Sequence, residues 1–120
     1  METSIIERIW QKAREVEGFP PDLLRQDVCG ALIMLSKYND TTSEYGWGID
    51  HIFPEALGGD DNMLNLRPLH CRNLMSKADD FPVYVATLTS VDGENVEKIR
   101  QIRIGNKIYL QLKELYGFPE

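Results

Sequence analysis

Acidic, histidine and amide side chains occur together in one short region of the chain. Residues 47–82 read WGIDHIFPEALGGDDNMLNLRPLHCRNLMSKADDFP, with Asp50 and His51 before a glycine-containing loop and Asn65 after it. Hydrolysis of a phosphodiester needs a base that activates water and a cation that neutralises the developing charge. A neutral imidazole can be that base, and carboxylate and amide oxygens can hold a hard divalent ion. These residue types therefore suit a one-metal phosphodiesterase site.

The order of these residues suggests a role for each. His51 is the candidate base and Asp50 the candidate metal ligand. Because neighbours in an ideal strand point to opposite faces, both can serve one site only if the strand ends or bulges there. The two-sided amide of Asn65 can hold the loop or the His51 region in place. A segment that begins near His70 can bring a further oxygen or nitrogen ligand to the metal.

Each of these residues also has a common structural role. An Asp-His pair before a proline turn is most often structural, and residues 58–61, Gly-Gly-Asp-Asp, form a turn when considered alone. Asn65 alone can cap a loop, Lys77 alone can be a solvated helix residue, and His70 can cap a helix start. The order and spacing of the whole set, rather than any single residue, favours the chemical interpretation.

Three elements must position this set. A short apolar strand ends at Asp50-His51, a second apolar run covers residues 66–69, and a helix-compatible segment carries His70, Asn73 and Lys77. The sequence therefore predicts two strands joined by a long loop and followed directly by a helix.

The N-terminal flank predicts mainly helix. Ser4 and Glu7 have the form of a capping box, and apolar residues at helical spacing predict an amphipathic helix over residues 4–17. Pro21 suits the first position of a short helix that ends near Arg25. The apolar run in residues 27–38 predicts a buried segment. Periodicity does not separate strand from helix there, and its glycine and Ile-Met pair slightly favour an extended conformation.

The C-terminal flank predicts a hairpin and a helix. Residues 83–88 and 95–104 read as two strands around an Asp92-Gly93 turn. Residues 107–116 predict a last helix that ends at Gly117. Its expected buried face consists of Ile108, Leu112 and Leu115.

Length and composition indicate one globular domain. The 120 residues are 42% hydrophobic and 27% charged, which is ordinary for a globular chain. No apolar run approaches the roughly 20 residues that cross a bilayer, and the N-terminal charge pattern is unlike a signal peptide. We therefore expect no membrane association and a cytoplasmic location. Cys29 and Cys71 form no CxxC pair, which excludes a four-cysteine zinc ribbon and favours buried free thiols.

The net charge of −6 opposes a function on nucleic acid. Neutralised phosphates supply most of the non-specific affinity of nucleic-acid binders, which usually show a basic surface. The local concentration of basic residues is Lys98, Arg100, Arg103 and Lys107. A bound metal ion would offset part of the acidity near the site.

The central stretch resembles the HNH endonuclease family of ββα-metal nucleases, in particular its compact bacterial members. The family pattern runs from D-H-I-x-P through G-G and N-L to a helix that bears Asn or His shortly before Lys. The matching residues here are Asp50-His51-Ile52, Pro54, Gly58-Gly59, Asn65-Leu66 and Lys77. Outside this core, the similar residues are Asp27, Cys29-Gly30-Ala31, Tyr45-Gly46-Trp47 and Asp79-Asp80-Phe81-Pro82. The core match covers about a third of the chain.

The resemblance implies an α+β fold in a single domain of residues 1–120. A ββα-metal core at residues 47–82 would be flanked by an N-terminal helix and by a C-terminal hairpin and helix. Asp50 would be a metal ligand, His51 the general base and Asn65 the middle residue of the motif. The implied cofactor is one divalent ion, Mg²⁺ or Mn²⁺ rather than Zn²⁺.

The resemblance also implies a reaction. The expected activity is metal-dependent endonucleolytic hydrolysis of double-stranded DNA, which leaves 5′-phosphate and 3′-hydroxyl ends. A monomer with one such site would nick one strand, whereas cutting both strands would need a homodimer or two visits. The oligomeric state and the DNA sequence preference are left open by the sequence.

The chain departs from the family at the last ligand position. That position lies three residues before the lysine and is occupied by Leu74, which cannot coordinate a metal. Asn73 can act if the helix shifts, because one residue on a helix rotates the side chain by about 100°. His70, one turn before Leu74, can substitute. Otherwise the site is impaired, and the chain is a non-catalytic HNH-like module that binds nucleic acid or protein.

Two sets of features separate these alternatives. The net charge and Leu74 favour the binding module. The intact set of Asp50, His51, Asn65 and Lys77 favours the enzyme.

Overall fold

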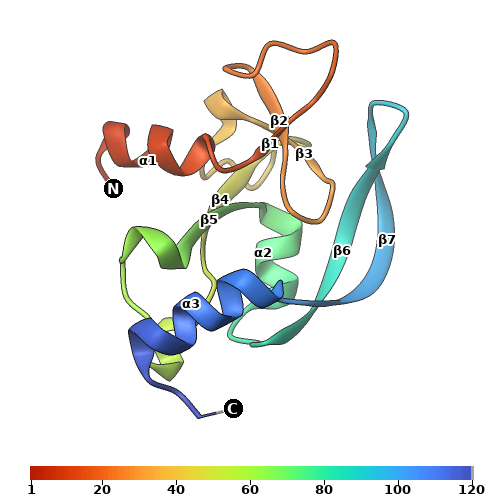
Figure 1. The fold of residues 1–120 in the computed structure, drawn as a ribbon. Coiled ribbons are helices and arrows are strands. Elements are labelled where there is room, and N and C mark those ends of the chain that lie inside the picture. Colours follow the sequence, from red (N-terminus) through yellow and green to blue (C-terminus); the bar gives the residue numbers. More distant parts are fainter. Residues whose placement is uncertain (120) are drawn as a thin grey trace.

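The fold is α+β, as expected, and consists of small antiparallel sheets and three α-helices within residues 1–119, which the computed structural model describes (Figure 1). The α-helices are α1 (Thr3–Trp10), α2 (Cys71–Lys77) and α3 (Asn106–Tyr116). The strands are β1 (Arg14–Glu15), β2 (Leu24–Gln26), β3 (Leu32–Met34), β4 (Trp47–His51), β5 (Leu66–His70), β6 (Val83–Val91) and β7 (Glu94–Arg103). Short 3-10 helices are η1 (Leu35–Lys37), η2 (Glu55–Leu57) and η3 (Met63–Asn65).

The N-terminal region contains less helix than its periodicity predicts. α1 ends at Trp10, and Glu2 rather than a Ser4 capping box stands at its N-terminus without a side-chain cap bond. The helix stops because Arg25 Nη1 donates to the carbonyl oxygens of Gln11 (3.2 Å) and Ala13 (3.1 Å). Tertiary contacts thus take over the carbonyls that further helical turns would use. The prediction of a helix over residues 4–17 is wrong beyond Trp10.

The first sheet has the order β1-β2-β3, with both pairs antiparallel. The short helix expected to end near Arg25 does not form, because residues 24–26 are the central strand of this sheet. The extended conformation expected within residues 27–38 is confirmed in β3.

The second sheet pairs β4 with β5, from Trp47 opposite His70 to His51 opposite Leu66. α2 follows β5 directly and contacts β4 and β6. The two strands and the following helix predicted in this region are confirmed. Their long connection, residues 52–65, carries η2 and η3.

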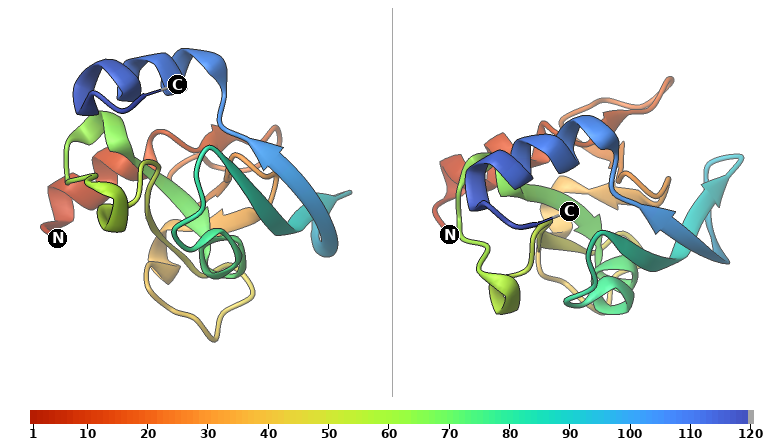
Figure 2. Two further views of the ribbon diagram at one scale, coloured as in Figure 1. Left: turned by 90° about the horizontal axis from the view of Figure 1, so that it is seen from below. Right: turned by 60° about the horizontal axis from the view of Figure 1, so that its bottom comes forward.

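The third sheet is the hairpin β6–β7, which turns at Asp92 and Gly93 through positive φ angles of 51° and 80°. Figure 2 shows the tip of this hairpin projecting from the rest of the molecule. The strand register shifts between Ala86 and Leu88, so that the backbone of Thr87 is released from regular pairing. That irregularity faces α2, where Asn73 accepts hydrogen bonds from it.

The last helix forms and ends as predicted, with Gly117 in the left-handed conformation at φ 66°. Its expected buried face is only partly correct. Leu112 is buried, whereas Ile108 and Leu115 are 36% and 41% exposed. α3 contacts η3 and lies across one side of the molecule (Figure 2), so a single row of its side chains reaches the core.

Two apolar clusters form the core. One joins α1 to the first two sheets through Ile9, Trp10, Ala13, Ile33, Trp47 and Leu66. The other joins the β4–β5 loop to the hairpin and α3 through Cys29, Ile52, Phe53, Leu69, Tyr84, Ala86, Ile104 and Leu112. Both cysteines are free as expected, although Cys71 is only partly buried.

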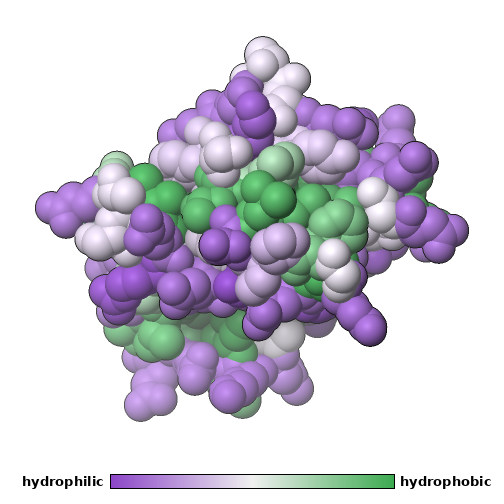
Figure 3. Space-filling view, turned by 90° about the horizontal axis from the view of Figure 1, so that it is seen from above, coloured by the Kyte–Doolittle hydropathy of each residue, from purple (hydrophilic) through white to green (hydrophobic). Residues whose placement is uncertain are grey.

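The surface keeps some apolar residues. Figure 3 shows them as a green band between hydrophilic residues on the face seen from above. Within residues 1–119, no helix has the length and hydrophobicity needed to cross a membrane.

Candidate functional site

His51 ends β4 and presents its imidazole to two carboxylates. Its Nε2 lies 2.7 Å from Asp61 Oδ1, and its Nδ1 lies 3.7 Å from Glu55 Oε1. One potential ligand atom from each of the three side chains lies within 4.8 Å of the other two. We call these three residues the His51 cluster. Imidazole and carboxylate groups at this spacing can be bridged by one divalent ion.

Two members of the His51 cluster, His51 and Glu55, line a cavity of about 230 Å³. The side chain of His51 is 21% exposed, and the carboxylates of Glu55 and Asp61 are largely exposed. The cavity is lined by Ile49, Asp50, His51, Pro54, Glu55, Leu74, Ala78 and Asp79. The carboxylates therefore retain oxygens that can accept further partners.

The β4–β5 loop is folded back toward His51 by Asn65. The amide of Asn65, buried at the end of η3, donates from Nδ2 to the carbonyl oxygens of Phe53 (3.0 Å) and Asp60 (3.1 Å). Its Oδ1 accepts a hydrogen bond from the backbone N–H of Phe53 (2.7 Å). These bonds fix the entrance of the loop next to its exit, and so bring Asp61 back to His51. The structure thus gives Asn65 the positioning role that its two-sided amide suggested.

Gly59 allows the same loop to close. A side chain here would place its Cβ 1.8 Å from the carbonyl oxygen of Phe53 and 2.9 Å from Nδ2 of Asn65. Only glycine permits this approach, because it has no Cβ. The Gly-Gly segment is therefore required by the loop that supplies Glu55 and Asp61.

Asp50 lies in a different environment from its neighbour. Its side chain is buried, and its carboxylate pairs with Arg67 Nε (2.8 Å to Oδ2) and with Lys77 Nζ (3.2 Å to Oδ1). Lys77 Nζ also donates to the carbonyl oxygens of His51 and Ile52, at 3.2 Å each. We call Asp50, Arg67 and Lys77 the Asp50 cluster. The carboxylate that the sequence suggested as a metal ligand is thus engaged by two cations.

The two cations respond differently to this burial. Burial lowers the pKa of Lys77, and the attraction of Asp50 offsets only part of that effect. Burial also opposes the charge of Arg67, but the interactions with Asp50 and, to a lesser extent, Tyr84 together outweigh this and raise the pKa of Arg67. Arg67 therefore provides the firmer counter-charge for Asp50.

Asn73 is buried beneath the hairpin, where all of its amide hydrogen-bonding capacity is used. Its Nδ2 donates to Asp27 Oδ2 and to the carbonyl oxygen of Leu88, at 3.0 Å each. Its Oδ1 accepts from the backbone N–H groups of Thr87 and Leu88, at 2.9 Å each. These are the groups that the register shift in β6 leaves exposed to α2. In this arrangement the amide has no free lone pair to offer a metal.

His70 is also fully engaged. Its Nδ1 accepts from the backbone N–H of Arg72 (3.1 Å) and so caps α2, while its Nε2 lies 2.7 Å from the carbonyl oxygen of Glu44. Burial lowers the pKa of His70, which favours the neutral ring that these two bonds require. The capping role considered from the sequence is the one that the structure displays.

Leu74, in contrast, faces the cavity beside His51. Its side chain packs on β4, where a Cβ added to Gly48 would lie 2.9 Å from Leu74 Cδ2. It also lines the cavity that borders the His51 cluster. The structure therefore brings together His51 and Leu74, whereas Asn73 and His70 make their contacts elsewhere.

Sequence reasoning missed Glu55 and Asp61 as partners of His51. The sequence predicted only a turn at Asp61 and no role for Glu55. The available signal was their position in the loop that begins immediately after His51 and returns at Asn65.

Comparisons with protein-family models, curated proteins and solved structures found no match. The resemblance to HNH endonucleases therefore stays a prediction that rests on residues 47–82.

Proposed function

We propose that this chain is a divalent-metal-dependent endonuclease of the HNH type, with residues 47–82 as its ββα-metal core and double-stranded DNA as its substrate. The observation that carries the proposal is the His51 cluster, in which two exposed carboxylates flank an imidazole, with Glu55 and the imidazole lining a cavity. Carboxylate oxygens are the ligands that Mg²⁺ and Mn²⁺ prefer. A bound ion would supply positive charge against the phosphate undergoing hydrolysis.

The three residues of the cluster have different proposed roles. A neutral His51 that donates from Nε2 to Asp61 keeps its Nδ1 lone pair, which can take a proton from water. Asp61 thereby orients the ring, as a carboxylate does for a catalytic histidine in other hydrolytic sites. Glu55 and the second oxygen of Asp61 are the proposed metal ligands. Asn65 holds the loop that carries both carboxylates and is thus a positioning residue.

A second candidate function is a non-catalytic module that binds nucleic acid or protein. The Asp50 cluster favours it, because the carboxylate expected to be a metal ligand is neutralised internally by Arg67 and Lys77. Leu74 at the cavity favours it as well, since it leaves α2 without a ligand there. The net charge of −6 disfavours strong binding to DNA without a bound cation.

The test is conversion of supercoiled plasmid to nicked and linear forms in EDTA, Mg²⁺ or Mn²⁺. Nicking that needs a metal and falls by about 10²-fold or more in His51→Ala is expected if His51 is the base. His51→Ala should unfold at nearly the same temperature as the wild type, as an ordinary surface variant does. Cleavage at the wild-type rate by this variant would remove His51 from the mechanism.

A pair of carboxylate variants tests the ligand assignment. Glu55→Gln should weaken Mn²⁺ binding measured by calorimetry, because it removes one charged ligand next to His51. Glu97→Gln, an equally exposed site on β7, is the matched control and should leave binding unchanged. Folded wild-type protein that binds Mn²⁺ but cuts no DNA would support the binding module instead.

A further inference from the structure

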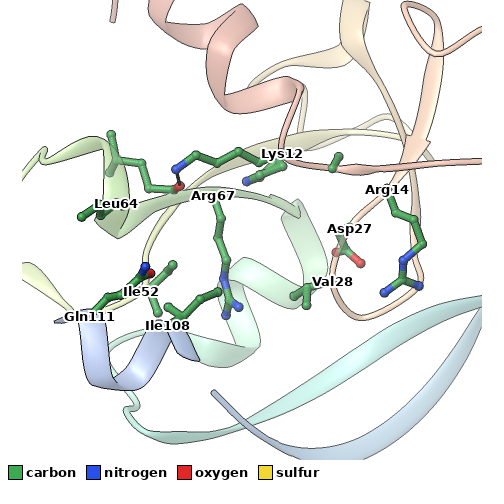
Figure 4. A pocket seen from close by; sticks show the side chains of 12 residues that line it. Lys12, Arg14, Asp27, Val28, Ile52, Leu64, Arg67, Ile108 and Gln111 are labelled. Atoms are coloured by element: carbon green, nitrogen blue, oxygen red, sulfur yellow. Dashed lines mark hydrogen bonds between the residues drawn. The ribbon is translucent and has the colours of Figure 1, made fainter. Parts of the chain in front are cut away.

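A larger cavity, of about 450 Å³, lies between β5, α3 and the segment that follows α1 (Figure 4). It shares no lining residue with the cavity beside His51. Most of its wall is aliphatic and consists of Ala13, Val28, Ile52, Leu64, Leu66, Pro68 and Ile108. Val28, Leu64 and Ile108 are substantially exposed, so the apolar surface continues outward at the opening. This volume lies within the usual range for a small-molecule site.

Arg67 lines this cavity with one donor unused. The residue is only 8% exposed, and its Nε is taken by Asp50, but its buried Nη2 has no hydrogen-bond partner. In Figure 4 the guanidinium projects from β5 toward Ile108 on α3. A buried donor without an acceptor is unfavourable, and the effect is greater when the group is charged. Because Nη2 is itself buried, a small rotation of the guanidinium would bring it to an acceptor atom in the cavity and complete its hydrogen bonds.

The other charged residues of the cavity leave an excess of positive charge. Lys12 and Arg14 line it, and within residues 1–119 neither forms an ion pair. Lys12 Nζ instead donates to the carbonyl oxygens of Met63 and Leu66 (2.7 Å to the latter). Burial lowers the pKa of Lys12, and the charge of Arg8 adds to that effect.

Asp27 is the acidic residue of the lining, and its charge is already used within the chain. Its Oδ1 accepts from the backbone N–H groups of Cys29 and Ala31, at 2.9 Å each. Its Oδ2 accepts from the backbone N–H of His70 (2.9 Å) and from Asn73 Nδ2 (3.0 Å). The basic residues that line this cavity are therefore not balanced by its acidic residue, which favours binding of an anion there although the whole protein carries a net charge of −6.

We propose that the cavity binds a small aliphatic carboxylic acid, with its carboxylate against Arg67 Nη2 and its alkyl chain along the aliphatic wall. A carboxylate supplies the acceptor that Nη2 lacks and the charge that balances Lys12 and Arg14. The aliphatic wall fits an alkyl chain better than a phosphate ester, whose several oxygens need more donors than the single open Nη2 group supplies. The inference does not depend on the activity of the His51 cluster.

Octanoate is the probe, and 1-octanol and acetate are its controls. Calorimetry should show saturable binding of one octanoate per chain. Octanol can still accept a hydrogen bond through its hydroxyl oxygen but carries no charge, so it should bind about tenfold more weakly or worse, as expected when a charge-assisted hydrogen bond is replaced by a neutral one. Acetate should bind far more weakly, because each methylene that is not buried costs about fourfold in affinity. Equal binding of octanoate and octanol, or no octanoate binding, would overturn the proposal.

Two variants on α3 locate the site without disturbing Arg67. Ile108→Trp fills the cavity and should abolish octanoate binding, whereas Leu110→Trp places the same side chain at an exposed position that does not line it. Leu110→Trp should therefore bind as the wild type does. Octanoate binding that survives in folded Ile108→Trp would place the ligand elsewhere and refute the assignment.

A third variant tests the anchor. Arg67→Lys keeps a cation next to Asp50 but removes the Nη2 donor, and should weaken octanoate binding by about tenfold, whereas octanol, which has only a neutral hydrogen bond to lose, should be affected much less. An unchanged preference for octanoate over octanol in this variant would show that Arg67 is not the anchor.

Discussion

Asp50 and His51 are consecutive in β4, yet the charges around them are arranged in opposite ways. In the Asp50 cluster one buried carboxylate is shared by two cations, and every charge has a partner inside the protein. In the His51 cluster one imidazole is shared by two carboxylates that remain largely exposed. A buried and fully paired carboxylate is held by its surroundings, whereas an exposed one keeps oxygens for an incoming ligand.

The difference shows which charges near a motif can act and which ones hold it in place. Lys77 reaches from α2 to the carbonyls at the end of β4 and thus secures the strand that carries His51. The Asp50 cluster is therefore the support, and the His51 cluster is the proposed working surface. Substitutions at Asp50, Asn73, His70 and Leu74 test this distinction.

The largest effect is expected for Asp50→Asn. This change leaves Arg67 and Lys77 buried without their shared anion, and should lower the free energy of unfolding by about 3–5 kcal/mol. Urea denaturation followed by circular dichroism measures it. Asp61→Asn is the control on the exposed side and should change stability by no more than about 0.5 kcal/mol. Similar losses in the two variants would erase the distinction between the clusters.

Asn73→Ala is expected to cost somewhat less, about 2–3 kcal/mol, because it strips acceptors and donors from buried groups of Asp27, Thr87 and Leu88. The same variant should bind Mn²⁺ as tightly as the wild type in calorimetry. His70→Ala should behave likewise, since the ring of His70 caps α2 and contacts Glu44. Weaker Mn²⁺ binding at unchanged stability would instead make the altered residue a ligand.

Leu74→Asn is expected to give the smallest change in free energy, but in the direction of gain. An amide oxygen at this wall of the cavity would add a ligand next to His51 and raise Mn²⁺ affinity by about tenfold, or roughly 1.4 kcal/mol. Met75→Asn, at the exposed neighbouring position of α2, should have no effect. If Leu74→Asn changes neither affinity nor nicking, the site does not need a ligand from the helix.

The sequence was sufficient where local signals decide the structure. The apolar runs of β4 and β5 and the Asp92-Gly93 turn each predict their element without reference to distant residues. α1 was too long in the prediction, because its end is set by Arg25, which binds carbonyls that helical periodicity assigns to the helix. Periodicity alone carries no information about such a contact.

The site was harder to predict than the elements. Asp50 and His51 were identified, but their different environments follow from the cross-strand pairing of Asp50 with Arg67, which requires the strand register. Glu55 and Asp61 reach His51 only because Asn65 closes the loop through three hydrogen bonds. The sequence offered Asn73 as one possible ligand, and its hydrogen bonds to β6 could not be foreseen, because the irregularity that it satisfies lies in another element.

The four hydrogen bonds accepted by Asp27 bear on how portable the motif is. This residue lies twenty positions before β4, yet it accepts hydrogen bonds from the backbone N–H of His70 and the amide of Asn73. Lys12 likewise donates to the carbonyl oxygen of Leu66 at the start of β5. Residues 47–82 therefore do not form a cassette that could be excised or grafted onto another scaffold. A graft would also have to include the Asp27 loop and the segment after α1. The structural unit that supports the site is therefore larger than its sequence motif.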